Sequence, residues 1–170
     1  NKNQDFTGSR DIVAFVDLGE QEKHIYNKVP EFGPVLGTGY PHNTLPHNNA
    51  NFLYEQIINF YSDIRTSSKA VVTLAPLSGQ NFKNGQDWEK IDQARKLKEN
   101  EYILNAKLGY ISLSAPLNAD EVLAVAYNYT IGDTTLQVGE FSSDGIDAPK
   151  TLVLKLLKGT NLSPGFPTWD

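Results

Sequence analysis

The clearest pattern in the chain is a short run near its start in which almost every position is apolar. In the run from Asp11 to Leu18 (DIVAFVDL), Ile12, Ala14, Val16 and Leu18 alternate with Val13, Phe15 and Asp17. A strand built from this run would present apolar side chains on both faces, which is typical of a strand inside a sheet. The run therefore predicts an interior strand.

Further β-type runs fill the second half of the chain. They are Tyr102–Leu104, Tyr110–Leu113, Val122–Ile131, Leu136–Phe141 and Thr151–Leu157. Turn-forming residues at Asn105–Gly109 and at Gly132-Asp133 join the first four of these into two predicted hairpins. We expect the second hairpin, Val122–Phe141, to organise the core, so that a charge at Val125 or Ala126 would unfold the domain.

One amphipathic helix is predicted from Asn51 to Arg65. Its apolar positions recur every three or four residues, at Leu53, Ile57, Phe60, Tyr61 and Ile64. Asn48 or Asn49 can cap its start, and Glu55 suits the first turn. Together these elements predict an α+β fold, in which this one main helix packs on an antiparallel, β-rich sheet.

Two segments between the helix and the hairpins have weaker patterns. Lys69–Ala75 (KAVVTLA) is predicted to be a strand that stops at Pro76. Trp88–Leu97 fits neither a helical nor a strand period, and its Lys and Glu content slightly favours a helix.

The stretch from Gly19 to Asn49 is predicted to be a long loop, because Gly, Pro and Asn recur throughout it. Its apolar side chains, such as Phe32 and Tyr40, indicate that it lies against the domain, where it could either contact a partner or cover the sheet. Residues 1–9 are polar and expected to be frayed. We expect residues 1–170 to form one soluble domain that is a fragment of a much larger protein.

Composition narrows the possible functions. The chain carries a net charge of −5, and its densest basic cluster, Arg95-Lys96-Lys98, lies beside acidic residues, which argues against a nucleic-acid binder. It has no cysteine, which excludes a catalytic thiol and thiolate metal sites. No apolar run is long enough for a membrane-spanning helix, and no signal peptide is recognisable.

Several residue groups could carry chemistry, but each has a simpler explanation. His42 and His47, with His24 far upstream, lie on a loop without the rigid spacing of a zinc site. Asp144 and Asp147 could hold calcium but lack its alternating acidic pattern. The remaining candidates are the carboxylates Asp120-Glu121 and Asp87 with Glu89, and the glycine segments Gly37-Thr38-Gly39, Gly79-Gln80 and Gly109-Tyr110. None forms a glycosidase pair, a phosphate loop or a nucleophile elbow, so we expect a non-enzyme with no cofactor, metal or catalytic residue.

Four tyrosines on predicted strands leave a binding function open. Tyr102, Tyr110, Tyr127 and Tyr129 could form a platform for a sugar or a peptide, although cross-strand packing is the commoner use of such residues. In Val122–Ile131 the face that bears Tyr127 and Tyr129 could also meet lipid in a membrane barrel. The opposite face is apolar too, which better fits a strand inside a soluble sheet.

The second half of the chain resembles a known family. The segment ARKLKENEYILNAKLGYISLSAPLNADEVLAVAYNYT (Ala94–Thr130), followed by QVGEFSSD (Gln137–Asp144), LVLKLLK (Leu152–Lys158) and PTWD (Pro167–Asp170), is similar to the Sov/SprA family. The similarity is closest over Asp87–Asp170 and looser upstream. Members of this family are very large outer-membrane proteins that serve as the translocon of the type IX secretion system and are needed for gliding motility.

The resemblance implies that this chain is a soluble internal domain of an outer-membrane protein-export pore. Such a domain would face the periplasm, the pore lumen or the cell surface. It would brace or gate the pore, or contact secreted cargo and other secretion-system proteins, without catalysis or nucleic-acid binding. The other hypothesis is an extracellular carbohydrate-binding or adhesin-type module.

Overall fold

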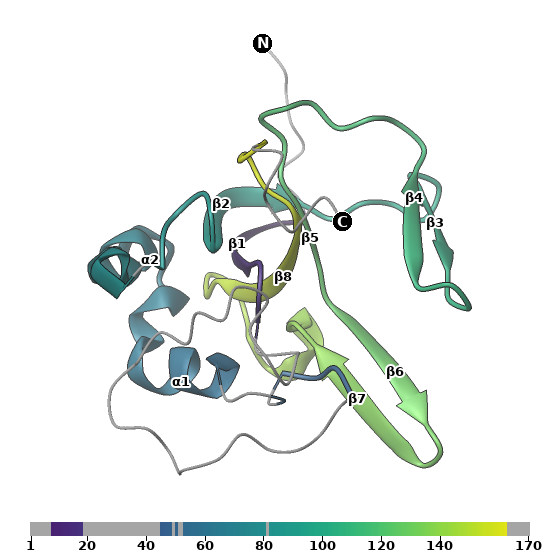
Figure 1. Ribbon diagram of the computed structural model, residues 1–170, viewed down its shortest axis with the longest axis horizontal. Coiled ribbons are helices and arrows are strands. Elements are labelled where there is room, and N and C mark those ends of the chain that lie inside the picture. Colours follow the sequence, from purple (N-terminus) through teal and green to yellow (C-terminus); the bar gives the residue numbers. More distant parts are fainter. Residues whose placement is uncertain (1–7, 19–44, 49, 51–52, 81, 163–170) are drawn as a thin grey trace.

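The computed structural model describes residues 8–18, 45–48, 50, 53–80 and 82–162. At its centre is a four-stranded sheet with the spatial order β2-β1-β8-β5 (Figure 1). Its strands are β1 (Ser9–Phe15), β2 (Trp88–Arg95), β5 (Leu123–Val125) and β8 (Leu152–Lys158). Most of the predicted long loop, namely residues 19–44, lies outside the described residues, as do 1–7 of the predicted frayed start. The sheet-rich α+β class is confirmed.

The sheet is mixed, which corrects the purely antiparallel arrangement predicted from the sequence. β1 pairs with β2 antiparallel and with β8 parallel, in the register Val13↔Lys90 and Val13↔Val153. β5 completes the sheet antiparallel to β8. A parallel pair requires a long connection between its strands, and here nearly the whole chain lies between β1 and β8.

The first strand lies between two hydrophobic cores, as its pattern predicts. Val13 and Phe15 belong to the larger core, which also contains the buried side chains of the helices, and Phe15 stacks against Phe82 there. Ala14 and Val16 belong to a smaller core on the other face of the sheet, together with Leu156. The prediction of an interior strand is therefore confirmed.

The predicted helix is shorter than expected and is followed by a second one. α1 covers Leu53–Phe60, a 3₁₀ turn η1 follows at Ser62–Arg65, and between them Tyr61 adopts φ −119° and ψ 36°, outside the helical range. Glu55 lies in the first turn of α1, as expected. Asn48 does not cap this helix, because its side chain bonds Gly139 instead, and Asn49 is outside the described residues.

The strand predicted at Lys69–Ala75 is wrong. The segment forms α2 (Ser67–Leu74), followed by the 3₁₀ turn η2 (Ala75–Gln80). Ala70 and Leu74, four positions apart, are both fully buried, whereas the neighbouring Val71 and Val72 are exposed. Burial of this helical pair outweighs the strand preference of the β-branched residues. Conversely, the undecided segment Trp88–Leu97 contains β2, with Trp88 in the larger core.

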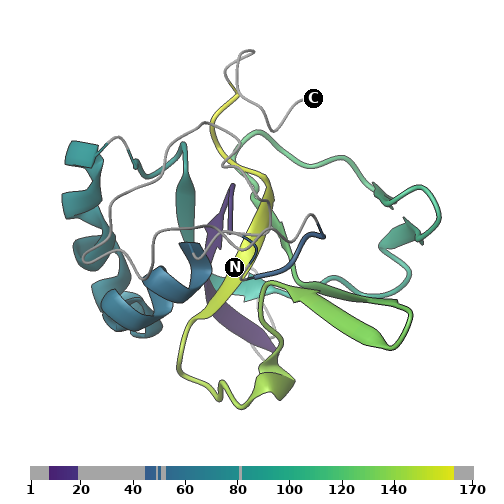
Figure 2. The ribbon, with the colours of Figure 1, turned by 60° about the horizontal axis from the view of Figure 1, so that its bottom comes forward.

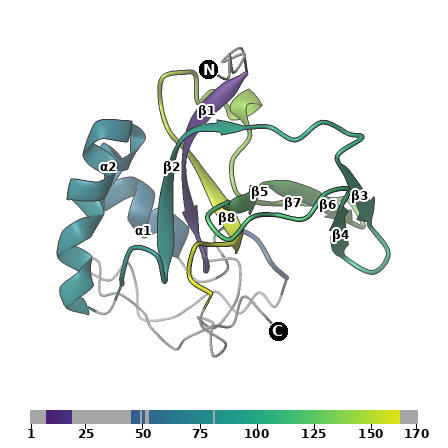
Figure 3. The ribbon, with the colours of Figure 1, turned by 90° about the horizontal axis from the view of Figure 1, so that it is seen from above.

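Two hairpins extend from the sheet on the side opposite the helices (Figures 1, 2 and 3). One consists of β3 (Tyr102–Asn105) and β4 (Tyr110–Leu113), the other of β6 (Tyr127–Ile131) and β7 (Thr134–Val138). Each forms a separate two-stranded sheet. Both predicted turns are confirmed.

The run Val122–Ile131 is not one continuous strand, and its hairpin does not organise the core. It divides at Ala126 into β5, which joins the main sheet, and β6, which leaves it. A Cβ atom added to Gly139, whose φ is +76°, would lie 2.9 Å from the Ala126 Cβ, so the end of β7 can approach this break only as glycine. Of the β6 and β7 residues, Val138 alone belongs to the larger core.

Candidate functional site

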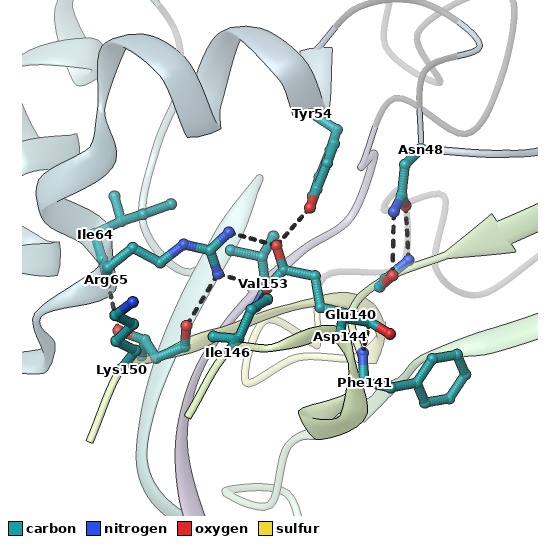
Figure 4. A network of polar contacts seen from close by, with 12 residues as sticks. Asn48, Tyr54, Ile64, Arg65, Glu140, Phe141, Asp144, Ile146, Lys150 and Val153 are labelled. Atoms are coloured by element: carbon teal, nitrogen blue, oxygen red, sulfur yellow. Dashed lines mark hydrogen bonds and ion pairs between the residues drawn. The ribbon is translucent and has the colours of Figure 1, made fainter. Parts of the chain in front are cut away.

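The most developed polar cluster is built around the carboxylate of Glu140 (Figure 4). This side chain is 1% exposed, and both of its oxygens accept hydrogen bonds. Oε1 accepts from the Tyr54 hydroxyl and from Arg65 Nη2, each at 2.5 Å. Oε2 accepts from Arg65 Nη1 at 2.5 Å and from the Val153 backbone N–H at 2.8 Å. Such complete pairing is what a buried charge requires.

The cluster joins the helical layer, the segment that follows β7 and the start of β8. Arg65, at the end of η1, also donates to the backbone oxygen of Thr151, and the Thr151 N–H donates back to the Arg65 carbonyl. The Thr151 hydroxyl donates to the carbonyl of Ile64 at 2.5 Å. We call Tyr54, Arg65, Glu140 and Thr151 the Glu140 latch, because they tie the helical layer to the start of β8.

The electrostatics of the latch fit a structural role. Burial, the hydrogen bond to Glu140 and its charge raise the pKa of the Tyr54 hydroxyl well above its ordinary value. Burial opposes the charge of Arg65, but Glu140 outweighs it and raises the pKa of that guanidinium. With its oxygens engaged and its side chain closed to solvent, Glu140 has no room for a substrate.

Sequence reasoning missed this latch. Glu140 lies in the apolar run Leu136–Phe141, where an isolated acid is unusual because a buried carboxylate needs partners. That signal was present, but nothing in the sequence identified Arg65, 75 residues away, as its partner.

Four of the six other candidate carboxylates hold local structure. The Asp87 carboxylate accepts a hydrogen bond from the backbone N–H of Lys83. The Asp144 carboxylate accepts one from the backbone N–H of Phe141 and one from the side-chain amide of Gln137. Glu121 accepts from the N–H of Asn118 in a turn. Glu89 is buried and accepts from both the N–H and the hydroxyl of Thr160. Turn and end-of-strand contacts therefore account for these four residues.

The remaining candidates are not brought together. Among the described residues, no group of three or more His, Asp or Glu side chains could hold a metal ion. His47 is half-buried, and burial lowers its pKa. His24, His42 and the segment 37–39 lie outside the described residues, while Gly109, with φ +68°, provides the turn of the β3–β4 hairpin.

The four strand tyrosines do not form one platform. The register of β3 and β4 pairs Tyr102 with Leu113 and Asn105 with Tyr110, so Tyr102 and Tyr110 lie on opposite faces of their hairpin. Tyr127 and Tyr129 do share a face of β6, with ring centres 6.3 Å apart. The Tyr129 hydroxyl donates to the carbonyl of Pro46, which connects this pair to residues 45–48.

The β3–β4 hairpin exposes the largest concentration of apolar side chains in the described part of the chain. Ile103, Leu104, Leu108 and Tyr110 are all at least 50% exposed, and Leu108 at the turn reaches 73%. On one face, the two cross-strand pairs Tyr102–Leu113 and Leu104–Ile111 are entirely apolar. We call the exposed side chains of this hairpin the hairpin surface. Ile103 and Tyr110 lie on one face of the hairpin and Leu104 on the other, with Leu108 in the turn, so the hairpin surface includes both faces. Exposed apolar side chains concentrated in this way mark sites that contact other molecules.

Charges are scarce on this hairpin. Between Tyr102 and Leu117 the single charged residue is Lys107, in the turn. Depletion of charge combined with exposed aromatic and aliphatic side chains is characteristic of the centre of a protein–protein interface. No helix in the described residues has the length and apolar character needed to cross a membrane.

Comparison with models of known protein families finds no match to the chain, and comparison with curated proteins finds no significant match. The similarity to the Sov/SprA family therefore remains a hypothesis carried by the quoted segments.

Proposed function

We propose that this chain is a non-catalytic domain of an outer-membrane protein-export translocon, acting in type IX secretion and gliding motility by contact with other proteins. The observation that carries the proposal is the hairpin surface. It consists of apolar side chains on a hairpin that pairs with no other strand among the described residues. The segment that resembles the Sov/SprA family, Ala94–Thr130, includes the whole of this hairpin.

The physical support is energetic. A two-stranded hairpin alone is marginally stable in water, and exposing several large apolar side chains on it is unfavourable. Burying them against another protein recovers about 25 cal/mol per Å² of apolar area. The contacted protein would be secreted cargo, an accessory subunit or the remainder of the parent barrel, and the contact would recognise cargo, gate the pore or brace it. The domain would lie in the periplasm, in the lumen or at the cell surface.

The test is a matched pair of substitutions in the full-length parent. Leu108→Ser removes an apolar side chain from the hairpin surface, and Val72→Ser removes one from α2, where the exposed fraction is the same 73%. We expect Leu108→Ser to reduce secretion of type IX cargo, and Val72→Ser to leave it unchanged, when both variants reach the outer membrane at wild-type levels. Equal secretion by the two variants would contradict the proposal.

The paired tyrosines of β6 support a second candidate, an extracellular carbohydrate-binding module. Tyr127 and Tyr129 lie side by side on one face, as aromatic rings that stack on a sugar do. Glycan binding that Tyr127→Ala abolishes while the fold stays intact would favour this function. A glycan array without any hit would remove it.

A further inference from the structure

Among the described residues no third strand pairs with the β3–β4 hairpin, so it presents an open edge as well as an apolar surface. Ser114 N–H donates to the Glu101 carbonyl at 2.9 Å, which makes Glu101–Ser114 a hydrogen-bonded pair at the base of the hairpin. In an antiparallel ladder, hydrogen-bonded and non-hydrogen-bonded pairs alternate. The register therefore makes Tyr102–Leu113 and Leu104–Ile111 the non-hydrogen-bonded pairs, whose backbone N–H and C=O groups point outward.

These outward backbone groups coincide with the apolar face. Tyr102 and Leu104 on β3 combine an outward N–H and C=O with an apolar side chain on the same face. β3 is the outer strand, farther from the main sheet than β4 (Figures 1 and 3). An additional strand beside β3 would satisfy its backbone groups and extend the apolar face at the same time.

We propose that β3 accepts an extended segment of a partner protein as a third, antiparallel strand. This inference rests on the proposed function and specifies how the hairpin contacts its partner. Three strands with an apolar face are independently stable where two are not, so the partner strand completes the hairpin. Main-chain hydrogen bonds supply affinity in strand addition, and alternate side chains supply specificity.

The charges near the hairpin indicate which segment fits. The stretch from Arg95 to Leu117 has four basic and two acidic residues, although the whole chain has 15 basic and 20 acidic ones. Of the two acids, Glu101 is already paired with Arg95. An antiparallel strand begins beside the turn, close to Lys107. The fitting segment therefore alternates apolar residues and carries a carboxylate at its amino end.

A second copy of this chain fits less well. Antiparallel pairing of β3 with β3 of another copy would place Lys107 of each chain near the base of the other hairpin. Residues 95–101 at this base carry three basic and two acidic side chains, so Lys107 would face a net positive charge. A partner with an acidic end avoids this repulsion.

The experiment uses a short synthetic peptide of alternating valine and threonine with aspartate at its amino end. Binding to the 170-residue chain is followed by NMR, with hydrogen exchange of the backbone amides as the second readout. We expect the Tyr102 and Leu104 amides to become protected, and the same peptide with a central proline to bind about tenfold more weakly. Replacing its aspartate by lysine should weaken binding in a salt-sensitive manner.

Two proline variants provide a matched comparison. Leu104 and Ile111 are cross-strand partners on the same face, and the N–H of each points out of the hairpin. Leu104→Pro removes a donor from the β3 edge, and Ile111→Pro removes one from the β4 edge, while both preserve the bonds within the hairpin. We expect Leu104→Pro to weaken peptide binding about tenfold and Ile111→Pro to leave it unchanged.

Three results would overturn the inference. They are absence of peptide binding, equal binding by the two proline variants, and a dimer of the free chain that Leu104→Pro dissolves. The last would make a second copy the occupant. If the peptide leaves β3 unprotected but Leu108→Ser still reduces secretion, strand addition is wrong and the proposed function stands. If the peptide protects β3 but the Leu108→Ser variant secretes cargo normally, strand addition at β3 stands and the proposed role in export is wrong.

Discussion

Arg65 and Glu140 form a two-pronged ion pair, in which each guanidinium nitrogen lies 2.5 Å from a different carboxylate oxygen. The two residues are 75 positions apart and come from the helical layer and from the segment between β7 and β8. The two hydrogen bonds run side by side between the guanidinium and the carboxylate, and this bidentate geometry restricts both side chains to one arrangement. The position of the helices against β8 depends on this pair.

Breaking the pair should be costly. Glu140→Gln keeps the shape of the side chain but leaves Arg65 without its counter-charge, so we expect a loss of about 3 kcal/mol in the free energy of unfolding. The control is Asp63→Asn, which breaks the exposed Lys69–Asp63 pair and should cost below about 1 kcal/mol. Urea denaturation measures both. Equal losses would show that the latch does not hold the helices.

The latch also predicts a stability change at alkaline pH. Tyr54 would titrate near 10 in the unfolded chain, whereas burial and the Glu140 carboxylate raise its pKa in the folded protein. The folded state thus holds this proton more tightly. Its contribution is fully present below pH 10 and is lost as the pH rises through the folded pKa. We expect the stability difference between wild type and Tyr54→Phe to shrink above pH 10, measured by denaturation at fixed pH. A constant difference would contradict this assignment.

The close approach of Gly139 to Ala126 predicts a specific packing penalty. Gly139 and Gly85 both have φ +76°, but a Cβ at Gly85 would meet nothing within 4 Å. Gly85→Ala should therefore cost about 1 kcal/mol for the backbone conformation alone. Gly139→Ala should cost about 2 kcal/mol more, because the added methyl group collides with Ala126. Thermal unfolding of the two variants tests this. Similar losses of stability would mean that the end of β7 can shift away from Ala126 without cost.

The hairpin surface should contribute little to the stability of the free domain. Leu108→Ala is expected to change the free energy of unfolding by about 0.5 kcal/mol or less, because Leu108 is mostly exposed. Leu53→Ala, the same substitution in the larger core, should cost about 2–5 kcal/mol. Chemical denaturation of both variants provides the comparison. A large loss for Leu108→Ala would show that the hairpin packs on this chain itself.

Elements with a local signal could be predicted from the sequence. The two-sided apolar pattern identified β1, and turn residues flanked by β-type runs identified both hairpins. α2 was missed because its two buried residues, Ala70 and Leu74, give too weak a helical period beside three β-branched neighbours. The pattern of Val122–Ile131 predicts one core strand, because it does not reveal where a strand leaves its sheet. At this break Gly139, from another segment, approaches Ala126 closely, which the pattern of a single run cannot show.

The candidate site was predictable only in its parts. The hairpin was expected, but its exposure was not, because an apolar strand has the same sequence pattern whether it meets its own core or a partner. The prediction that Val125→Asp unfolds the domain now needs revision. Val125 is half-buried in a strand at the sheet edge, whereas Val153 is fully buried. Val125→Asp should therefore lower the free energy of unfolding by less than Val153→Asp does.

The parallel pairing of β1 with β8 affects the order in which the domain can fold. The contact between Arg10 and Lys150, next to this pair, spans 140 positions. Closing so long a loop costs conformational entropy before any contact compensates for it, and proteins dominated by distant contacts fold slowly. During synthesis, the central strand therefore cannot complete its pairing until the segment that contains β8 has been made. β2 comes earlier in the chain and can cover one edge of β1. Until β8 arrives, the other edge of this apolar strand stays open to chaperones and to aggregation.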